Sequence, residues 1–290
     1  MSTEQTAATR PTTDLLTPSA VRAGDRPRAL VAWSSGKDAA YALHDVRQAG
    51  DLEVVGLITT VTRTFERVSM HGVREVLLEA QAASIGLPLT RVEIPYPCPN
   101  EVYEQAMADT LTSAAARGVT HVVFGDLFLA DIRAYREAQL ARVGFTGVFP
   151  LWGRDTTALA HEMIAAGLDA RLVCVDPSCL DRSFAGRRFD RDLVAELPAG
   201  VDPCGENGEF HTFVADGPMF ARPVPVIPGV IVERDGFVFA DLVDVILVAA
   251  ADASQRVKTA AEAWAADTIP AGAAGRISRR SSGVRAARAP

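Results

Sequence analysis

The chain has 290 residues, of which 48% are hydrophobic and 22% are charged, and its formal net charge is −7. A chain of this length can bury a full core, and we expect one sizeable α/β domain with a smaller appendage. The acidic balance argues against stable binding to nucleic acid, which depends on clustered lysine and arginine, and no apolar run approaches the roughly 20 residues of a membrane-spanning helix.

Residues 1–27 are predicted to form a disordered leader. They lack the positively charged start and the apolar block of a secretory signal. The four cysteines never form a C-x-x-C pair, which argues against a structural zinc site and against a disulfide framework. Both observations favour a reducing, cytoplasmic location.

Residues 28–182 are predicted to form the main domain. The apolar run at 28–33 is typical of a buried parallel strand, and the apolar spacing after it predicts a helix that stops at Gly50. Further strands are predicted at 53–61, 89–94, 121–126 and 171–175, and further helices at 73–86, 100–117, 131–143 and 156–166. This alternation indicates an α/β fold with a doubly wound parallel sheet, whose ligands bind at the carboxyl ends of the strands.

The pattern changes at residue 183, where loops rich in proline and glycine replace the alternation. Short β-like runs follow at 226–248, so residues 183–250 are predicted to be a smaller C-terminal α+β lobe that binds substrate. Residues 251–290 are rich in alanine and arginine, with one candidate helix up to residue 266, and are expected to be partly disordered.

The stretch "SSGKD", from Ser34 to Asp38, joins the first predicted strand to the first predicted helix. A helix N-terminus presents unpaired backbone N–H groups at the positive end of the helix dipole and so attracts anions. Ser34 and Ser35 can donate hydroxyl hydrogen bonds to a phosphate, Gly36 allows a tight turn, and Lys37 adds a mobile positive charge. Asp38 can bind a magnesium ion. The simpler alternative is a capped helix beside a surface lysine.

This stretch resembles the S-G-G-K-D-S loop of the ATP pyrophosphatases, or PP-loop enzymes. Ser35 stands at the first glycine of that loop and Ala39 at its last serine. The resemblance implies a Rossmann-like fold of the HUP type, and cleavage of ATP to AMP and pyrophosphate. Ala39 lacks the hydroxyl of that last serine, so the loop offers one phosphate donor fewer.

Two downstream segments resemble the diphthine–ammonia ligase, or diphthamide synthase, family. The first is a G-D pair after a strand, Gly125 and Asp126, followed by R-x-x-x-E at Arg133 and Glu137 and by P-L-W at 150–152. The second is "CGENGEFHTFV", residues 204–214. The resemblance covers residues 28–220.

Each residue of the first segment also has a structural interpretation. Asp126 can cap the following helix, or it can bind magnesium or face the adenosine. Arg133 and Glu137 lie four residues apart, as in a surface ion pair; we favour this for Glu137 and leave Arg133 open as a phosphate contact. Trp152 is expected in the core.

The second segment carries two carboxylates, Glu206 and Glu209, between glycines that shape a tight loop. They resemble a site that receives an amine or ammonia, and a solvated acidic turn is the alternative. Residues 206–212 without Phe210 are the predicted substrate site, namely Glu206, Asn207, Gly208, Glu209, His211 and Thr212. His211 is interpreted as structural rather than as a base. His71 is ambiguous, and Cys204 has no neighbouring base that would make it a nucleophile.

The leading hypothesis is an ATP-dependent, AMP-forming ligase that activates a carboxylate as an acyl-adenylate for amidation. Lys37, Asp38, Glu206 and Glu209 are the predicted catalytic residues. ATP and Mg²⁺ are the implied cofactors, with Asp38 and Asp126 as metal ligands. The partners would be a small-molecule or protein carboxylate, ammonia or an amine, and a second copy of the chain. A tRNA-modifying PP-loop enzyme and a nucleotide-binding protein without turnover are the alternatives.

Overall fold

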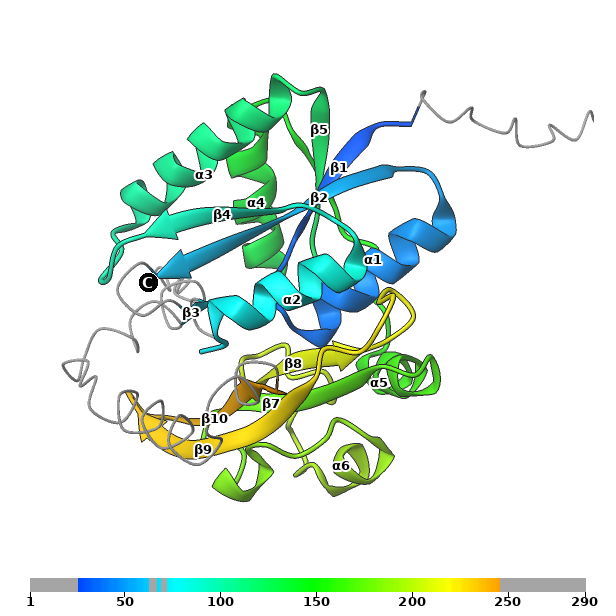
Figure 1. The fold of residues 1–290 in the computed structure, drawn as a ribbon, viewed down its shortest axis with the longest axis vertical. Coiled ribbons are helices and arrows are strands. Elements are labelled where there is room, and N and C mark those ends of the chain that lie inside the picture. The colour runs from blue at the N-terminus through cyan, green and yellow to red at the C-terminus, as the bar shows by residue number, and fades with distance from the viewer. Residues whose placement is uncertain (1–25, 63–66, 69–71, 246–290) are drawn as a thin grey trace, which may run out of the picture.

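The computed structural model describes residues 26–62, 67–68 and 72–245, and it contains two β-sheets (Figure 1). The larger sheet is mostly parallel and is formed by the first half of the chain. The smaller sheet is antiparallel and is formed by the second half. The α/β architecture and the smaller C-terminal lobe predicted from the sequence are confirmed.

The larger sheet has five parallel strands in the order β4-β2-β1-β5-β6, and β3 pairs antiparallel with β2. Its strands are β1 (Arg28–Ala32), β2 (Glu53–Thr62), β3 (Arg67–Val68), β4 (Leu89–Ile94), β5 (Val119–Val123) and β6 (Thr146–Val148). The chain builds outward from β1 through β2 and β4, then returns to the opposite side of β1. The strand order therefore reverses between β1 and β5, which is where doubly wound sheets bind ligands.

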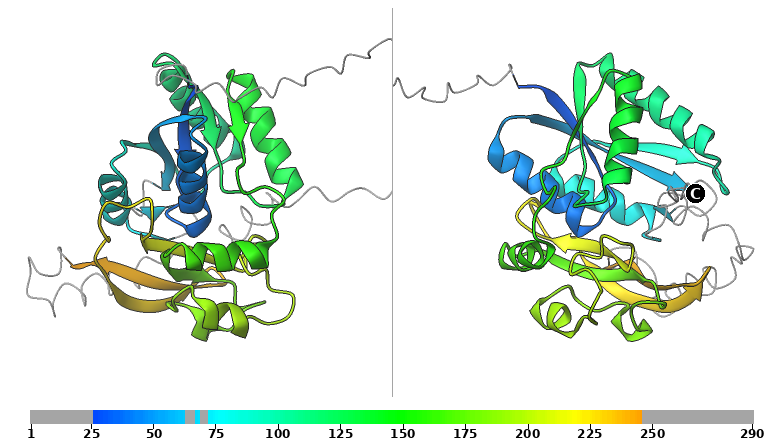
Figure 2. Two further views of the ribbon diagram at one scale, coloured as in Figure 1. Left: turned by 90° about the vertical axis from the view of Figure 1, so that its right-hand side faces the viewer. Right: turned by 180° about the vertical axis from the view of Figure 1, so that it is seen from behind.

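Helices cover both faces of the parallel sheet (Figure 2). The helices are α1 (Lys37–Ala49), α2 (Glu75–Ile85), α3 (Asn100–Ala115) and α4 (Ala130–Arg142). The first two pack in one hydrophobic cluster and lie between the two sheets, whereas α3 and α4 pack in a second cluster on the other face. The left-handed conformation of Gly50 (φ 73°) ends α1, as its sequence predicts.

The smaller sheet has the order β8-β7-β10-β9. Its strands are β7 (Asp169–Val175), β8 (Phe210–Asp216), β9 (Val226–Arg234) and β10 (Phe237–Asp244), and its helices are α5 (Thr156–Ala165), η1 (Arg182–Phe184) and α6 (Arg191–Glu196). Asp235 and Gly236 both have positive φ and join β9 to β10 in a two-residue hairpin turn.

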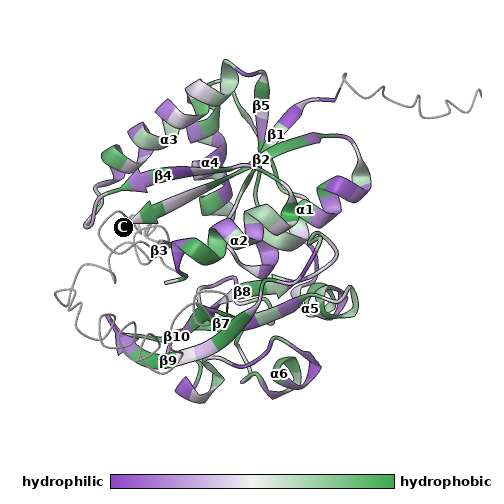
Figure 3. Ribbon diagram, in the orientation of Figure 1, coloured by the Kyte–Doolittle hydropathy of each residue, from purple (hydrophilic) through white to green (hydrophobic). Residues whose placement is uncertain are grey.

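The main hydrophobic cluster runs through both halves of the molecule. It includes residues of α1 and α2 above and of β7, β8 and β10 below, so the two sheets share one core. Hydrophobic residues concentrate on the central strands, while the outer helices alternate in polarity (Figure 3). Within the described ranges, no helix has both the length and the apolar character needed to cross a membrane.

Two predicted strands differ from the structure, and the short strand β6 is additional. The strand predicted at 121–126 is β5, which ends at Val123, so Gly125 and Asp126 lie in the loop beyond it. The strand predicted at 171–175 is β7, which we expected in the parallel sheet; it pairs instead with β8 and β10. The short strand β6 was not predicted, because three residues carry no periodicity.

The predicted division of the chain is only partly visible. The strands β9 and β10 confirm the β-like runs up to Asp244. Most of the predicted leader and all of the tail at 251–290, including its candidate helix, lie outside the described residues. The residue at which the two main parts divide stays a prediction.

Candidate functional site

The stretch Ser34 to Asp38 lies between the carboxyl end of β1 and the start of α1, as predicted. Ser35 has a positive φ of 72°, a backbone conformation that glycine adopts more readily than serine. Gly36 is the N-cap residue of α1 and has no side chain that could cap the helix. The loop thus has the tight turn that an anion site at a helix N-terminus requires.

Thr212 supplies the missing cap from the other half of the molecule. Its hydroxyl oxygen accepts a hydrogen bond from the backbone N–H of Lys37 at 3.0 Å. A Cβ on Gly36 would lie only 3.3 Å from the carbonyl oxygen of Thr212. The strand β8 is therefore packed directly on the loop, and Thr212 joins the predicted site as a residue that orders α1.

Lys37 is buried, with 2% of its side chain exposed, so the alternative of a surface lysine is wrong. Its ammonium donates to the carboxylate of Asp38 at 2.8 Å and to the carbonyl oxygen of Cys204. It also lies 5.5 Å from the ring centroids of Phe189 and Phe210. Burial is the largest single effect and lowers the pKa of Lys37, but the negative groups around the ammonium, Asp38 first among them, together raise the pKa, so the ammonium stays charged.

Gly125 brings the β5–α4 loop against the start of α1. A Cβ at this position would lie 2.6 Å from the carbonyl carbon of Asp38 and 2.8 Å from the amide nitrogen of Ala39. Neither backbone atom can move without moving the helix. Gly125, predicted as a nucleotide contact, thus also has a steric role that follows from the structure.

Asp126 is not a helix cap, because α4 begins at Ala130 and has no side-chain cap. Its carboxylate, which is 11% exposed, pairs with the Nε of Arg136 at 3.0 Å. The guanidinium of Arg136 lies 4.6 Å from the ring centroid of Phe124. The ion pair with Arg136 therefore holds the Asp126 carboxylate between the candidate site and α4.

Arg133 and Glu137 form the i,i+4 ion pair that we favoured for Glu137, with 2.8 Å between Nε and Oε1. The Arg133 guanidinium lies 4.7 Å from the ring centroids of both Phe149 and Trp152. Trp152 is half-buried. The expectation that it belongs to the core is wrong, because one face of its ring carries a cation.

Glu206 reaches the β5–α4 loop from the second half of the chain. One carboxylate oxygen accepts a hydrogen bond from the backbone N–H of Leu127 at 2.7 Å, and the N–H of Phe128 lies 3.4 Å away. Burial and, to a smaller extent, the charges of Asp38 and Asp126 together raise the pKa of Glu206 to about 7, against the lowering effect of the Leu127 hydrogen bond. Glu206 is thus poised to exchange a proton near neutral pH.

Glu209 points into the protein. Its Oε1 accepts hydrogen bonds from the backbone N–H of Asp202 and the amide of Asn207, both at 2.9 Å, while its Oε2 is buried without a hydrogen-bond partner. Gly205 and Gly208 have φ of 70° and 89°, which confirms that glycines shape this loop. The alternative of a solvated acidic turn is wrong for Glu209, which is 6% exposed.

Two further residues of this segment behave as structural groups. Burial, followed by the charge of Lys37, lowers the pKa of His211 to about 4, so the imidazole is neutral at pH 7. Burial raises the pKa of the Cys204 thiol to about 12, and its sulfur lies 3.4 Å from the carbonyl oxygen of Thr156. A thiol in this state is not a nucleophile. His71 lies outside the described residues.

Three segments far apart in sequence therefore meet at the start of α1: the loop 34–38, the loop after β5 and the loop before β8. Sequence reasoning missed two residues that support this junction. Asp202 accepts a hydrogen bond from the N–H of Glu206 and donates its own N–H to Glu209. Gln81 is buried under the first loop. The signal for Gln81 was present, because it is a polar residue on the apolar face of its predicted helix.

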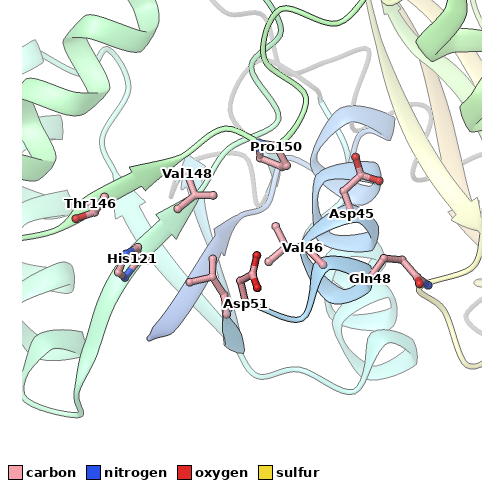
Figure 4. A pocket seen from close by; sticks show the side chains of 10 residues that line it. Asp45, Val46, Gln48, Asp51, His121, Thr146, Val148 and Pro150 are labelled. Atoms are coloured by element: carbon pink, nitrogen blue, oxygen red, sulfur yellow. The ribbon is translucent and has the colours of Figure 1, made fainter. Parts of the chain in front are cut away.

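A pocket of about 540 Å³ lies elsewhere, between the C-terminal half of α1 and the strands β5 and β6 (Figure 4). Asp45, Val46 and Gln48 line it from the helix, and His121 and Val148 from the strands. None of the predicted site residues lines it. The candidate site is thus the junction at the start of α1.

Comparison with known proteins agrees with the motifs. The family model described as "Diphthamide synthase N-terminal domain" matches residues 27–146, and "Diphthamide synthase C-terminal domain" matches residues 155–238. The chain belongs to the diphthamide synthase family. The two matches divide the family fold between the parallel sheet and the antiparallel sheet, so each contributes part of the candidate site.

Proteins with similar sequences include several named diphthine–ammonia ligase. The one from Danio rerio is 36% identical over 102 residues, which are 33% of this chain and 40% of the relative. The one from Homo sapiens is 33% identical over 118 residues, 39% and 44% respectively, and the one from Schizosaccharomyces pombe is 31% identical over 97 residues, 32% and 16%. The matched segments thus span less than half of each relative's length.

Proposed function

We propose that this diphthamide synthase family member is an ATP-dependent ligase that converts a carboxylate to an amide with ammonia or an amine, and that it forms AMP and pyrophosphate. The observation that carries the proposal is the meeting of Lys37, Asp38 and Glu206 at the start of α1. A phosphate-binding loop and a carboxylate with a pKa near neutrality are the two parts that adenylation followed by amine attack requires.

The residues present fit the triphosphate of ATP. The start of α1 offers a positive helix end, a Cβ on Gly36 would be in tight contact with Thr212, and the hydroxyl of Ser35 is buried without a hydrogen-bond partner. When ATP binds, the Lys37 ammonium would give up its hydrogen bond to the carbonyl oxygen of Cys204 and donate to phosphate oxygens instead. Ser34, Ser35, Gly36, Lys37 and Asp38 are thus proposed to hold the phosphates, with Gly125, Asp126 and Arg133 as the second group of nucleotide contacts.

In the first step a substrate carboxylate oxygen attacks the α-phosphorus, and the bond between that phosphorus and the β-bridging oxygen breaks. Pyrophosphate leaves with the electron pair, and the charge of Lys37 stabilises it. In the second step the amine nitrogen attacks the acyl carbon, AMP leaves, and Glu206 accepts the proton that the nitrogen loses. Glu209, Asn207 and Thr212 hold the loop that presents Glu206, with Gly208 and His211 in the same segment.

Magnesium would find hard oxygen ligands in this site. Asp38 and Asp126 carry carboxylates whose charges both act on Glu206, and Mg²⁺ is commonly bound by one or two carboxylates together with phosphates. The ion would neutralise charge on the phosphates as pyrophosphate leaves. Asp38 and Asp126 would then each give up part of their pairing with Lys37 and Arg136.

The acceptor is proposed only as a class, namely a carboxylate on a small molecule or on a protein. Relatives are named for diphthine, but the matched segments cover less than half of those proteins. A cytoplasmic location and a homodimer stay predictions. A nucleotide-binding protein without turnover is the alternative that the test must distinguish.

The test is pyrophosphate release. The chain is incubated with ATP, magnesium, ammonium and a panel of carboxylates, and pyrophosphate and AMP are measured together. The chain has only two lysines, so Lys258→Ala is a matched control for Lys37→Ala. We expect Lys258→Ala to keep full activity, and Lys37→Ala and Glu206→Gln to lose at least tenfold, with far-UV circular dichroism checking that each variant is folded.

Two results would overturn the proposal. ATP binding without AMP under any condition would favour the nucleotide-binding protein. Formation of ADP in place of AMP would show cleavage at the wrong phosphoanhydride bond.

A further inference from the structure

Gln81 is a fully buried amide on α2 that contacts the phosphate loop from below. Its exposed fraction is 0%. Its Nε2 donates to the carbonyl oxygen of Ser35 at 3.2 Å and to that of Val214 at 2.7 Å, and its Oε1 accepts from the indole N–H of Trp33 at 2.9 Å. If the amide were flipped, its oxygen would face two carbonyl oxygens and its NH₂ group would face the indole N–H. The hydrogen bonds therefore fix the orientation of the amide.

These contacts act on the one strained residue of the loop. Ser35 is held at φ 72°, a left-handed conformation that a residue with a Cβ adopts less readily than glycine does. Its carbonyl oxygen accepts from two donors, the Gln81 amide and the backbone N–H of Val214 at 3.0 Å. Two donors on one carbonyl define the plane of the peptide bond between Ser35 and Gly36.

The plane of that peptide decides what the loop presents to an anion. In a trans peptide the N–H points opposite to the C=O, so a Ser35 carbonyl directed at Gln81 and Val214 directs the Gly36 N–H away from them. A flipped peptide would place a carbonyl oxygen where the N–H had been, and two negative groups would then face each other.

We infer that Gln81 is a positioning residue that sets the phosphate-binding conformation of the loop. This inference rests on the proposed function, which supplies the anion. Gln81 does not touch the nucleotide in this account; it acts through Ser35. In a chain where serine replaces the glycine of the related loops, the amide holds a conformation that glycine would adopt unaided.

A purely structural role makes a different prediction. Gln81 also joins α2 to β8 and satisfies the Trp33 indole, so its loss will lower stability in any case. Ser84 provides the matched control. It lies one turn further along α2, is 3% exposed, and shares hydrogen bonds with the backbone of Arg222 without touching the loop.

The experiment compares Gln81→Leu, Ser84→Ala, Ser35→Gly and the double variant Ser35→Gly/Gln81→Leu in the full chain. ATP binding with magnesium is measured by calorimetry well below each Tm. Amide hydrogen exchange of the peptide spanning residues 33–40 is measured without ligand. Gln81→Asn, which keeps the amide but is one methylene shorter, replaces Gln81→Leu if that variant does not fold.

We expect Gln81→Leu to weaken ATP binding at least tenfold and to speed exchange in the loop, with Ser84→Ala close to wild type in both. In the double variant glycine restores ATP affinity to within about threefold of Ser35→Gly, while the loss of Tm caused by Gln81→Leu remains. A merely structural residue would give no such separation between affinity and Tm.

Two results would overturn the inference. One is unchanged affinity and unchanged exchange in Gln81→Leu; the other is a double variant no better than Gln81→Leu. If the wild-type chain does not bind ATP, the proposed function fails. The exchange data then decide the role of Gln81 alone, with faster exchange that Ser35→Gly reverses supporting it and unchanged exchange refuting it.

Discussion

Ser35 occupies a backbone conformation that favours glycine, and its buried hydroxyl has no hydrogen-bond partner. Both features cost stability, so Ser35→Gly should raise the free energy of unfolding by about 1 kcal/mol after the extra entropy of a glycine in the unfolded chain is subtracted. Chemical denaturation measures the change. The neighbouring Ser34→Gly is the control and should destabilise, because Ser34 has no positive φ and its hydroxyl lies 3.4 Å from the Gly36 N–H. A destabilised Ser35→Gly would show that the serine is not strained.

Glu206 predicts a pH dependence of stability that requires no substrate. Its pKa in the folded protein is about 7, above the ordinary value of 4.5, mainly because of burial. The folded protein therefore holds the Glu206 proton more tightly than the unfolded chain does. This contribution to the free energy of unfolding is fully present below about pH 4.5 and is lost as the pH rises through about 7. Glu206→Gln should therefore raise the Tm relative to wild type at pH 8.5 and change it little at pH 5. The exposed Glu101→Gln is the control, and equal shifts at the two pH values for Glu206→Gln would contradict the assignment.

The same residue predicts the pH dependence of the proposed reaction. Glu206 can accept a proton only when it is ionised, so the rate of amide formation should rise as the pH passes through about 7. Glu206→Gln should remove that rise along with most of the rate. Amide product measured from pH 5.5 to pH 8.5 at a fixed concentration of free ammonia tests this, and an unaltered pH profile in the variant would assign the proton acceptor to another group.

At the scale of elements, the β5–α4 loop and the start of α1 are in backbone contact at Gly125. Gly125→Ala should cost about 2 kcal/mol or more, because the new Cβ meets backbone atoms at 2.6 to 2.8 Å. Gly144→Ala has a positive φ of 76° but open space around it, so it should cost only about 1 kcal/mol. Denaturation of both variants separates steric cost from conformational cost. Equal losses would mean that the loop can move away from α1.

The elements were predicted well wherever a long periodic segment specified them. The strand at 89–94 and the ends of α1 and α5 agree with the sequence to within a residue or two. The sequence could not show which strands pair with one another. Nothing in residues 171–175 distinguishes a parallel strand from an antiparallel one, because β7 is nearly all buried and its partner β10 lies about 65 residues further on.

The candidate site was predicted only in part, because sequence motifs identify single residues but do not show which distant segments come into contact. Motifs named Lys37, Asp38 and Glu206, since these residues are local signals. The contacts of Lys37 with Cys204 and of Gln81 with Val214 join residues more than 130 positions apart, so they depend on how the two sheets pack. Burial of Lys37 was likewise invisible, because lysine is rarely buried unless it is paired.

For the whole molecule, one core that runs through both sheets predicts that the two halves unfold together. Leu193 on α6 is fully buried in that core, and α6 lies on the far side of the antiparallel sheet from α1 (Figure 1). Leu193→Ala should cost about 2–5 kcal/mol and lower the Tm by about 5–15 °C. Because unfolding is cooperative, the fluorescence of Trp33, at the end of β1, should report the same lower Tm as far-UV circular dichroism.

The test uses a chain in which Trp152 and Trp264 are replaced by phenylalanine, so that Trp33 is the only one of the three tryptophans left. Val102→Ala, at a position 42% exposed, is the control and should move neither signal. Two separate transitions, with Trp33 unaffected by Leu193→Ala, would mean that the halves are independent. A single transition would mean that the contacts between Lys37 and Cys204 and between Gln81 and Val214 form and break with the fold as a whole. The candidate site, which both halves build, would then exist only while both are folded.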